Sequence, residues 1–372
     1  MPDHAISSDP AVQAQLDRLT MLSPGKDVLG LTRIAALLER LGNPHLNLPP
    51  VFHVSGTNGK GSTCAFLRGA IEAAGMTTHV YSSPHLVRFN ERIRVAGKLI
   101  DDATLSALLS EVLDHAEGLE ASFFEVTTAV AFCAFARTPA DACIVEVGLG
   151  GRLDATNVVD HPALTIITPV DLDHQQYLGE TLAQIAGEKA GIIKRAVPCV
   201  VGPQLDEGLE VIERVAARNG APVYAYGQHY HVSTERGRLI YQDERGLLDL
   251  PLPNLPGPHQ IQNAGGAVAA LRVLGFGEEA CEAAVTRAFW PARMQHMKSG
   301  HLVDLAKPAE LWLDGGHNPH AGRALAETLA ALPDRPIHLI CGMLNTKDIG
   351  GYLRPLAKIA KSLIALSIPG EA

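Results

Sequence analysis

A glycine-rich segment with one lysine is the strongest chemical signal in the sequence. Residues 51–63 read VFHVSGTNGKGST, which predicts a buried strand, a tight turn and the start of a helix. In such a turn, backbone N–H groups, the positive end of the helix and the ammonium of Lys60 can bind phosphate. The alternative interpretation is an ordinary glycine-rich turn, which would not explain why a lysine and a Ser-Thr pair follow the glycines.

The segment departs twice from the usual phosphate-loop pattern GxxxxGK[ST]. Val54 holds the first glycine position, and Gly61 holds the position of the hydroxyl residue. That hydroxyl normally binds magnesium. We therefore expect a magnesium ligand to come from Ser62 or from the end of another strand.

Three further polar residues follow the ends of predicted strands. Ser83 comes after Thr78–Tyr81, Glu146 lies near the end of Ala142–Val147, and His174 follows Leu164–Thr168 by a short loop. Carboxyl ends of parallel strands form the edge at which open α/β sheets bind ligands. A carboxylate inside an apolar strand is costly without a partner, so a metal ion suits Glu146, and a structural arginine is the alternative. Taken alone, Ser83 is typical of a turn and His174 of a surface loop.

The complete series of motifs is similar to that of one enzyme family. After GTNGKGS come YSSPHL at 81–86, FNERI at 89–93, FFE at 123–125, EVGLGGRLDATN at 146–157, DH at 173–174, GEKAG at 187–191, Arg293, and DGGHNPH at 314–320. In this order they resemble folylpolyglutamate synthase/dihydrofolate synthase, a branch of the Mur ligase superfamily, over essentially the whole chain from about residue 20. The glycine before His317 replaces an alanine that is frequent in the family, a change that we expect to be harmless.

The resemblance implies an ATP-dependent ligase. It would join L-glutamate to the carboxylate of dihydropteroate or a reduced folate through an acyl phosphate, and would release ADP and phosphate. Ser83 and Glu146 would bind one Mg²⁺, and His174 with Lys189 would bind a second. Family members carry the lysine at the position of Lys189 as a carbamate. A plain surface lysine paired with a glutamate is the alternative for that residue. Lys60, Lys189 and His317 are the expected catalytic residues.

The resemblance also implies where the two larger substrates bind. The expected nucleotide-binding residues are Gly56, Thr57, Asn58, Gly59, Lys60, Gly61, Ser62, Asn263, Arg293 and Asp314. Those expected for the pterin-bearing substrate are Val28, Leu29, Gly30, Ser122, Phe123, Phe124, Glu125, Leu153, Asp154 and Ala155. The two phenylalanine rings can stack on a flat heterocycle, or they can belong to the core.

Alternating strand and helix patterns predict the framework that positions these residues. Apolar runs alternate with helical spacing up to about residue 226, which favours a mainly parallel sheet covered by helices. Residues 229–257 are polar, alternating and proline-rich, and predict a small β excursion. A second alternation begins after Arg293. We therefore predict an ATP-binding domain at 1–296 and a smaller Rossmann-like domain at 297–372, which is expected to be incomplete because family members continue further.

Composition restricts the classes of function. The chain has 372 residues, of which 47% are hydrophobic, and its formal net charge is −9. A negative net charge argues against a protein that mainly coats nucleic acid or anionic membranes. Neither a secretory signal nor a membrane-spanning run is recognisable, so we expect a cytoplasmic protein, and the family resemblance suggests a monomer.

Two other functions stay open on the sequence alone. A peptidoglycan ligase of the Mur type would use the same loop and metals, but it has a nucleotide-sugar domain before the loop, and here only about 50 residues precede Val51. A truncated, non-catalytic ATP-binding remnant is the other alternative. The motifs do not decide between dihydrofolate synthesis, polyglutamylation and both.

Overall fold

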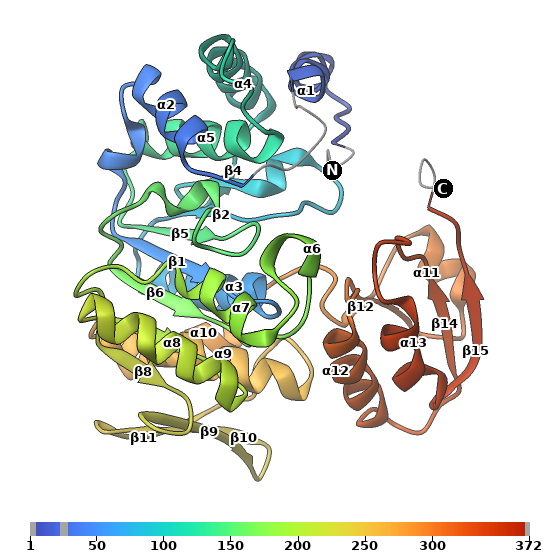
Figure 1. The fold of residues 1–372 in the computed structure, drawn as a ribbon. Helices are drawn as coiled ribbons and strands as arrows, with labels where there is room; N and C mark the ends of the chain where they lie inside the picture. Colours follow the sequence, from blue (N-terminus) through green and yellow to red (C-terminus); the bar gives the residue numbers. More distant parts are fainter. Residues whose placement is uncertain (1–4, 23–28, 369–372) are drawn as a thin grey trace.

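A large, mainly parallel sheet forms the centre of the molecule. The computed structural model describes residues 5–22 and 29–368, and its main sheet has eight strands in the order β4-β3-β2-β5-β1-β6-β7-β8 (Figure 1). Strands β3 and β4, at one edge, pair in antiparallel fashion. The strands are β1 (Val51–Ser55), β2 (Thr78–Tyr81), β3 (Ile93–Val95), β4 (Lys98–Leu99), β5 (Ala142–Glu146), β6 (Leu164–Ile167), β7 (Cys199–Val201) and β8 (Val223–Ala225).

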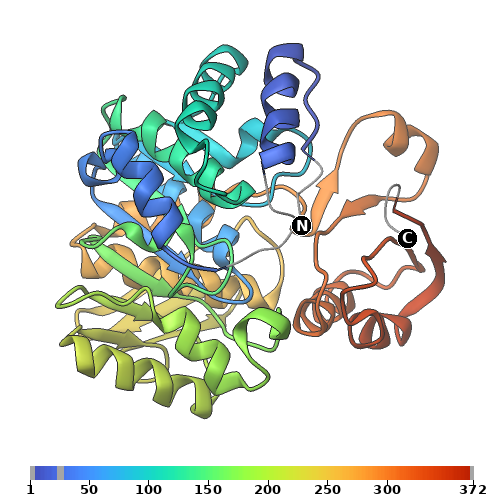
Figure 2. The ribbon, with the colours of Figure 1, turned by 45° about the horizontal axis from the view of Figure 1, so that its top comes forward.

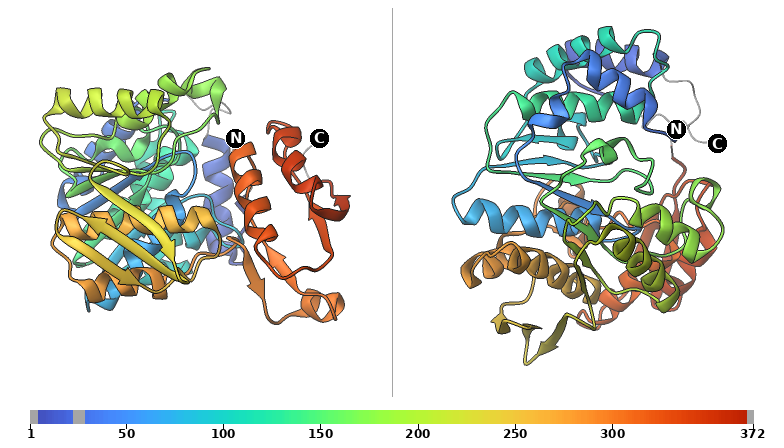
Figure 3. Two further views of the ribbon diagram at one scale, coloured as in Figure 1. Left: turned by 90° about the horizontal axis from the view of Figure 1, so that it is seen from below. Right: turned by 60° about the vertical axis from the view of Figure 1, so that its left-hand side comes forward.

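Helices cover both faces of this sheet, and this explains its continuous apolar strands. All residues of β1, β2, β5 and β6 are buried. One face packs on α3 (Lys60–Ala73), α9 (Pro258–Val273) and α10 (Glu278–Arg287). The opposite face packs on α1 (Pro10–Leu22), α2 (Thr32–Arg40), α4 (Asp102–Ala116), α5 (Phe123–Ala136), α7 (Leu182–Ala190) and α8 (Asp206–Asn219). The right-hand view of Figure 3 shows this arrangement, with light-blue α3 and the orange helices on one side.

The predicted β excursion is a three-stranded antiparallel sheet. It consists of β9 (Tyr230–Glu235), β10 (Arg238–Asp243) and β11 (Gly246–Leu250). Alternate side chains, among them Val232, Leu239 and Tyr241, are buried in the same core as α9. The excursion therefore extends this core and contributes no residue of the predicted site.

A second unit follows α10 and lies beside the first (Figure 2). It contains β12 (Gln295–Met297), α11 (His301–Ala306), β13 (Leu311–Leu313), α12 (Pro319–Ala330), β14 (Ile337–Cys341), α13 (Ile349–Ala357) and β15 (Ala360–Ala365). Strands β12 and β13 are antiparallel, whereas β14 and β15 are parallel. The unit has a small core of its own around Met294, Leu325, Tyr352 and Leu356. The chain thus enters the second unit near Gln295, and the division at 296/297 stays a prediction.

Short helices complete the connections. They are η1 (Pro44–Asn47), η2 (Phe89–Arg92), η3 (Ala155–Val158) and α6 (Gln175–Leu178). Within residues 5–22 and 29–368, no helix combines the length and the apolar character that a bilayer span requires. The architecture confirms the predicted fold class of a mainly parallel α/β unit followed by a smaller α/β unit.

Candidate active site

A cavity of about 1070 Å³ lies between the two units, at the carboxyl ends of β1, β2, β5 and β6. It is lined by every predicted site residue within the described chain, from Leu29 at one end of the sequence to His317 at the other. Val28 lies outside the described residues. The topology places these residues together because β1, β2, β5 and β6 run parallel, so that the loops following them meet at one edge.

The local geometry explains why two positions of the phosphate loop are glycine. Gly59 adopts the left-handed conformation (φ 87°) directly before α3, and a side chain there would collide with Asn263. A Cβ on Gly61 would lie 2.7 Å from the Trp290 indole. The missing hydroxyl of the standard pattern is therefore a consequence of packing, because the indole occupies the space that a serine side chain would need.

Two residues of this loop that carry donor groups, Asn58 and Lys60, line the cavity. The Nζ of Lys60 donates to the carbonyl oxygens of Gly56 (3.1 Å) and Thr57 (3.4 Å). The Nδ2 of Asn58 is buried and has no hydrogen-bond partner in the described chain. An ammonium and an amide donor next to a helix N-terminus suit the oxygens of a bound phosphate.

Glu146 has the properties expected of a carboxylate that binds a cation, because it is buried and one of its oxygens has no hydrogen-bond partner in the described chain. Only 4% of the residue is exposed, and its Oε2 has no hydrogen-bond partner in the described chain. Burial raises the pKa of Glu146 to about 7, against the opposing effects of the Lys60 and Arg293 charges and the Ser83 backbone. Within residues 5–22 and 29–368, no three or more His, Cys, Asp or Glu side chains lie close enough together to hold a metal ion by themselves. Mg²⁺ fits such a site, because it commonly binds through one or two carboxylates together with waters and substrate phosphates.

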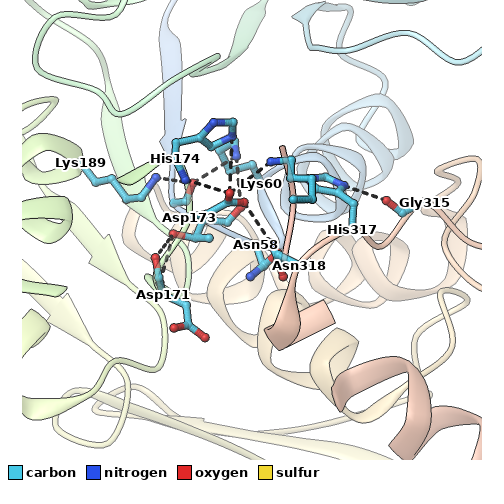
Figure 4. Close-up of polar contacts among 12 residues, drawn as sticks. Asn58, Lys60, Asp171, Asp173, His174, Lys189, Gly315, His317 and Asn318 are labelled. Carbon is cyan, nitrogen blue, oxygen red and sulfur yellow. Dashed lines mark hydrogen bonds and ion pairs between the residues drawn. The ribbon is translucent and has the colours of Figure 1, made fainter. Parts of the chain in front are cut away.

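Lys189 and His174 face the same part of the cavity (Figure 4). Lys189 is buried, contrary to the surface alternative, and its Nζ donates to the Gly56 carbonyl at 2.9 Å. Burial, reinforced by the charge of Lys60, lowers the pKa of Lys189 to about 7. Burial likewise lowers the pKa of His174 to about 4, which leaves a neutral imidazole at pH 7. Neutral imidazole is the form that binds metals.

The start of α5 and the loop after β5 also line the cavity. Ser122 and Glu125 form the capping box of α5, in which the Oγ of Ser122 accepts from the Glu125 N–H and Glu125 Oε2 accepts from the Ser122 N–H. Asp154 caps η3 in a similar way. These three residues therefore shape the wall through backbone hydrogen bonds. Phe124, whose ring lies 5.8 Å from that of Tyr81, supplies an aromatic surface.

The second unit and α9 contribute the opposite wall. Asn263 donates to Gln260 Oε1 (3.0 Å), and Gln260 Nε2 donates to Ser62 Oγ (3.2 Å). The carboxylate of Asp314 accepts from the N–H groups of Met294 and Gly316, at 2.9 and 2.8 Å.

Several cavity residues were not predicted individually. Asp173 and Asn318 stand inside motifs of the family series, so a signal existed, but no role was assigned to either. Gln260, His259 and Lys347 carry no signal in the sequence, and only their positions around the cavity identify them.

Comparisons with known proteins agree with this geometry. The Mur ligase middle domain matches residues 54–271, and the Mur ligase glutamate ligase domain matches residues 292–372. The dihydrofolate synthase/folylpolyglutamate synthase of Bacillus subtilis is 36% identical over an alignment of 353 residues, and the match covers 90% of this chain and 80% of that protein. The enzyme of the same name from Escherichia coli is 37% identical over an alignment of 349 residues, and the match covers 92% of this chain and 78% of that protein.

Solved structures agree at the level of the fold. The structure of Escherichia coli FolC in complex with DHPP and ADP has a TM-score of 0.87 and 33% identity, and the match covers 97% of this chain and 89% of that one. A bifunctional folylpolyglutamate synthase/dihydrofolate synthase with Mn, AMPPNP and L-glutamate bound has a TM-score of 0.86 and 34% identity, and the match covers 98% of this chain and 87% of that one. The chain belongs to the Mur ligase family and, within it, to the dihydrofolate synthases/folylpolyglutamate synthases.

Proposed function

We propose that this chain is an ATP-dependent ligase that joins L-glutamate to the carboxylate of dihydropteroate or a reduced folate and releases ADP and phosphate. One observation carries the proposal: a phosphate loop, a buried carboxylate with one oxygen that has no hydrogen-bond partner in the described chain, and a buried lysine line the same cavity between the two units. The two related structures above, which bind ADP with DHPP and AMPPNP with L-glutamate, support it.

The chemistry begins with activation of an unreactive carboxylate. A carboxylate oxygen attacks the γ-phosphorus of ATP and the bond to the β-phosphate oxygen breaks, which yields an acyl phosphate and ADP. The amine of glutamate then attacks the acyl carbon, phosphate leaves, and the amine loses a proton. Charge on the phosphoryl oxygens must be stabilised in the first step, a role suited to Lys60 and the Asn58 amide.

We assign the metal sites as follows. Ser83 and Glu146 would hold one Mg²⁺, and His174 with Lys189 would hold a second. Bound metal would neutralise phosphate charge and keep the attacking carboxylate in line. A lysine whose pKa is about 7 is partly neutral at pH 7, and the neutral amine is the form that can react with CO₂. This supports the proposal that Lys189 becomes a carbamate, which would present an oxygen to the metal.

The remaining roles follow from position in the cavity. Asn263, Arg293 and Asp314 would bind the nucleotide, and His317 would help to order the intermediate or glutamate. Phe123 and Phe124, beside the wall of Leu29, Gly30, Leu153, Asp154 and Ala155, would contact the pterin-bearing substrate. We further propose a division of the chain at 296/297, and a monomer, because one chain supplies all the site residues. We also propose that the enzyme acts in the cytoplasm, where ATP is available.

A phosphate-release assay tests the function. The reaction contains ATP, Mg²⁺ and L-glutamate, with dihydropteroate or a reduced folate as acceptor, and omission of either the acceptor or glutamate is the control. We expect phosphate release that depends on both. Lys60→Ala, Glu146→Ala and His174→Ala should each abolish it while retaining the parent circular dichroism spectrum. Folded variants that turn over at the parent rate would show that the assigned site is wrong.

A further inference from the structure

The carboxylate of Asp173 connects the two units of the molecule. Asp173 lies in the loop between β6 and α6, in the first unit. Its Oδ2 accepts from the Asn318 Nδ2 at 3.1 Å (Figure 4). Its Oδ1 accepts from the Lys347 Nζ at 3.2 Å, and both donors belong to the second unit. The same Oδ1 accepts from the backbone N–H of His174 at 2.8 Å.

Asn318 extends this connection to the phosphate loop. Its Nδ2 also donates to Asn58 Oδ1 (2.9 Å), and its Oδ1 accepts from the Ala321 N–H at the start of α12. The residue is 4% exposed, and all its side-chain hydrogen-bonding groups are engaged. The side chain therefore fits only when α12, the phosphate loop and Asp173 are in register.

The ion pair at the centre is shielded from solvent. The side chains of Lys347 and Asp173 are 17% and 13% exposed. A second ion pair between the units, Arg323 with Asp171, is 56% and 30% exposed. Exposed pairs contribute little, whereas removing one partner of a buried pair leaves an uncompensated charge. The first pair should therefore determine how the units dock, and the second provides a matched control.

His174 depends on this arrangement for its geometry. It adopts a left-handed backbone conformation (φ 52°), which is uncommon for a residue other than glycine. The N–H that Asp173 accepts belongs to this strained residue. The surroundings must compensate for such strain. The Asp173 carboxylate contributes by accepting from the His174 N–H, and the N–H groups of Tyr177 and Leu178 donate to the His174 carbonyl.

We propose that Asp173 is a positioning residue, which docks the second unit onto the phosphate loop through Lys347 and Asn318 and thereby holds His174 in place. The inference deepens the proposed function and rests on it, because a transfer between substrates held by two units requires both units in register. Asp173 itself need not touch a substrate for this role.

Small-angle X-ray scattering of the ligand-free full chain tests docking without any activity. The parent is compared with Asp173→Asn, Lys347→Met and the double variant, and with Asp171→Asn and Arg323→Gln as controls. We expect a larger radius of gyration for the first three and parent-like scattering for the controls. Scattering of Asp173→Asn that superimposes on the parent curve would overturn the proposal, even if the chain proved to catalyse a different reaction.

Kinetics of the same variants test the link to catalysis. We expect Asp173→Asn to lower kcat by about 10- to 100-fold with little change in the KM for ATP. The kcat of the double variant should be no lower than that of the less active single variant, because both changes break the same contact. Losses that multiply in the double variant, or an unchanged kcat in Asp173→Asn, would refute the positioning role. Circular dichroism confirms that each variant is folded.

Discussion

Replacement of Gly61 by serine restores the usual phosphate-loop pattern, and the structure predicts that it damages this protein. A Cβ at this position would lie 2.7 Å from Cε2 and Cζ2 of Trp290. Carbon atoms pack favourably at about 3.5–4.0 Å, so the indole would have to move by about 1 Å. Trp290 is followed directly by Pro291, Ala292 and Arg293, so the displacement would spread into the connection between the two units.

Overpacking of this size typically costs about 1–3 kcal/mol. We therefore expect Gly61→Ser to lower the free energy of unfolding by that amount, measured by urea denaturation, and to reduce phosphate release. The added hydroxyl should not improve the apparent affinity for Mg²⁺. A Gly61→Ser/Trp290→Leu variant should recover stability, because the smaller side chain makes room for the hydroxymethyl group.

Gly277→Ser is the matched control for this experiment. Gly277 precedes α10 and has an ordinary negative φ, and a Cβ added there would meet no heavy atom within 4 Å. Serine there should change stability by only about a few tenths of a kcal/mol. If Gly61→Ser is as stable as the Gly277 control and binds Mg²⁺ more tightly than the parent, the packing explanation for the altered motif is wrong.

Three other substitutions test separate parts of the molecule. Glu146→Gln should lower the ligation rate by at least about 100-fold and abolish the rise in melting temperature that Mg²⁺ with ADP produces in the parent; an unchanged rise would exclude Glu146 as a ligand. Phe124→Ala should raise the KM for the pteroate acceptor more than that for ATP, and equal changes would argue against stacking. His53 is fully buried, with its Nε2 2.9 Å from Thr156 Oγ1, and burial lowers its pKa from 6.5 to about 3. As the pH falls below 6.5, the unfolded chain binds a proton at this histidine before the folded chain does, so the free energy of unfolding decreases until the pH reaches about 3. Between pH 7.5 and 5.5 the free energy of unfolding of the parent should therefore fall by about 1.4 kcal/mol more than that of His53→Gln. Urea denaturation that gives the same pH dependence for both proteins would contradict this.

Much of the framework could be predicted because its signals are local. The apolar run before Gly56 and the spacing after Lys60 specify a strand, a turn and a helix, and they are β1 and α3 in the structure. The strand-end positions of Ser83, Glu146 and His174 predicted a common edge, and all three line one cavity. Periodicity was less informative in the second unit, where β12 and α11 are too short to show a pattern.

Contacts between distant residues were beyond any local pattern. Lys347 and Asp173 are 174 positions apart, and nothing around Lys347 indicates that it faces the first unit. The motifs of Asn58, Asp173 and Asn318 were visible, but their hydrogen bonds to one another were not.

The sequence by itself determined the alternation of strands and helices, the phosphate-binding turn and the family of the chain, because these depend on residue types at short spacing. Only the tertiary structure decided why residue 61 is glycine, why Lys189 is buried, and which side chains join the two units. Those properties depend on the volume and charge that surround each residue after packing, and the neighbours that supply them are brought together only by the fold.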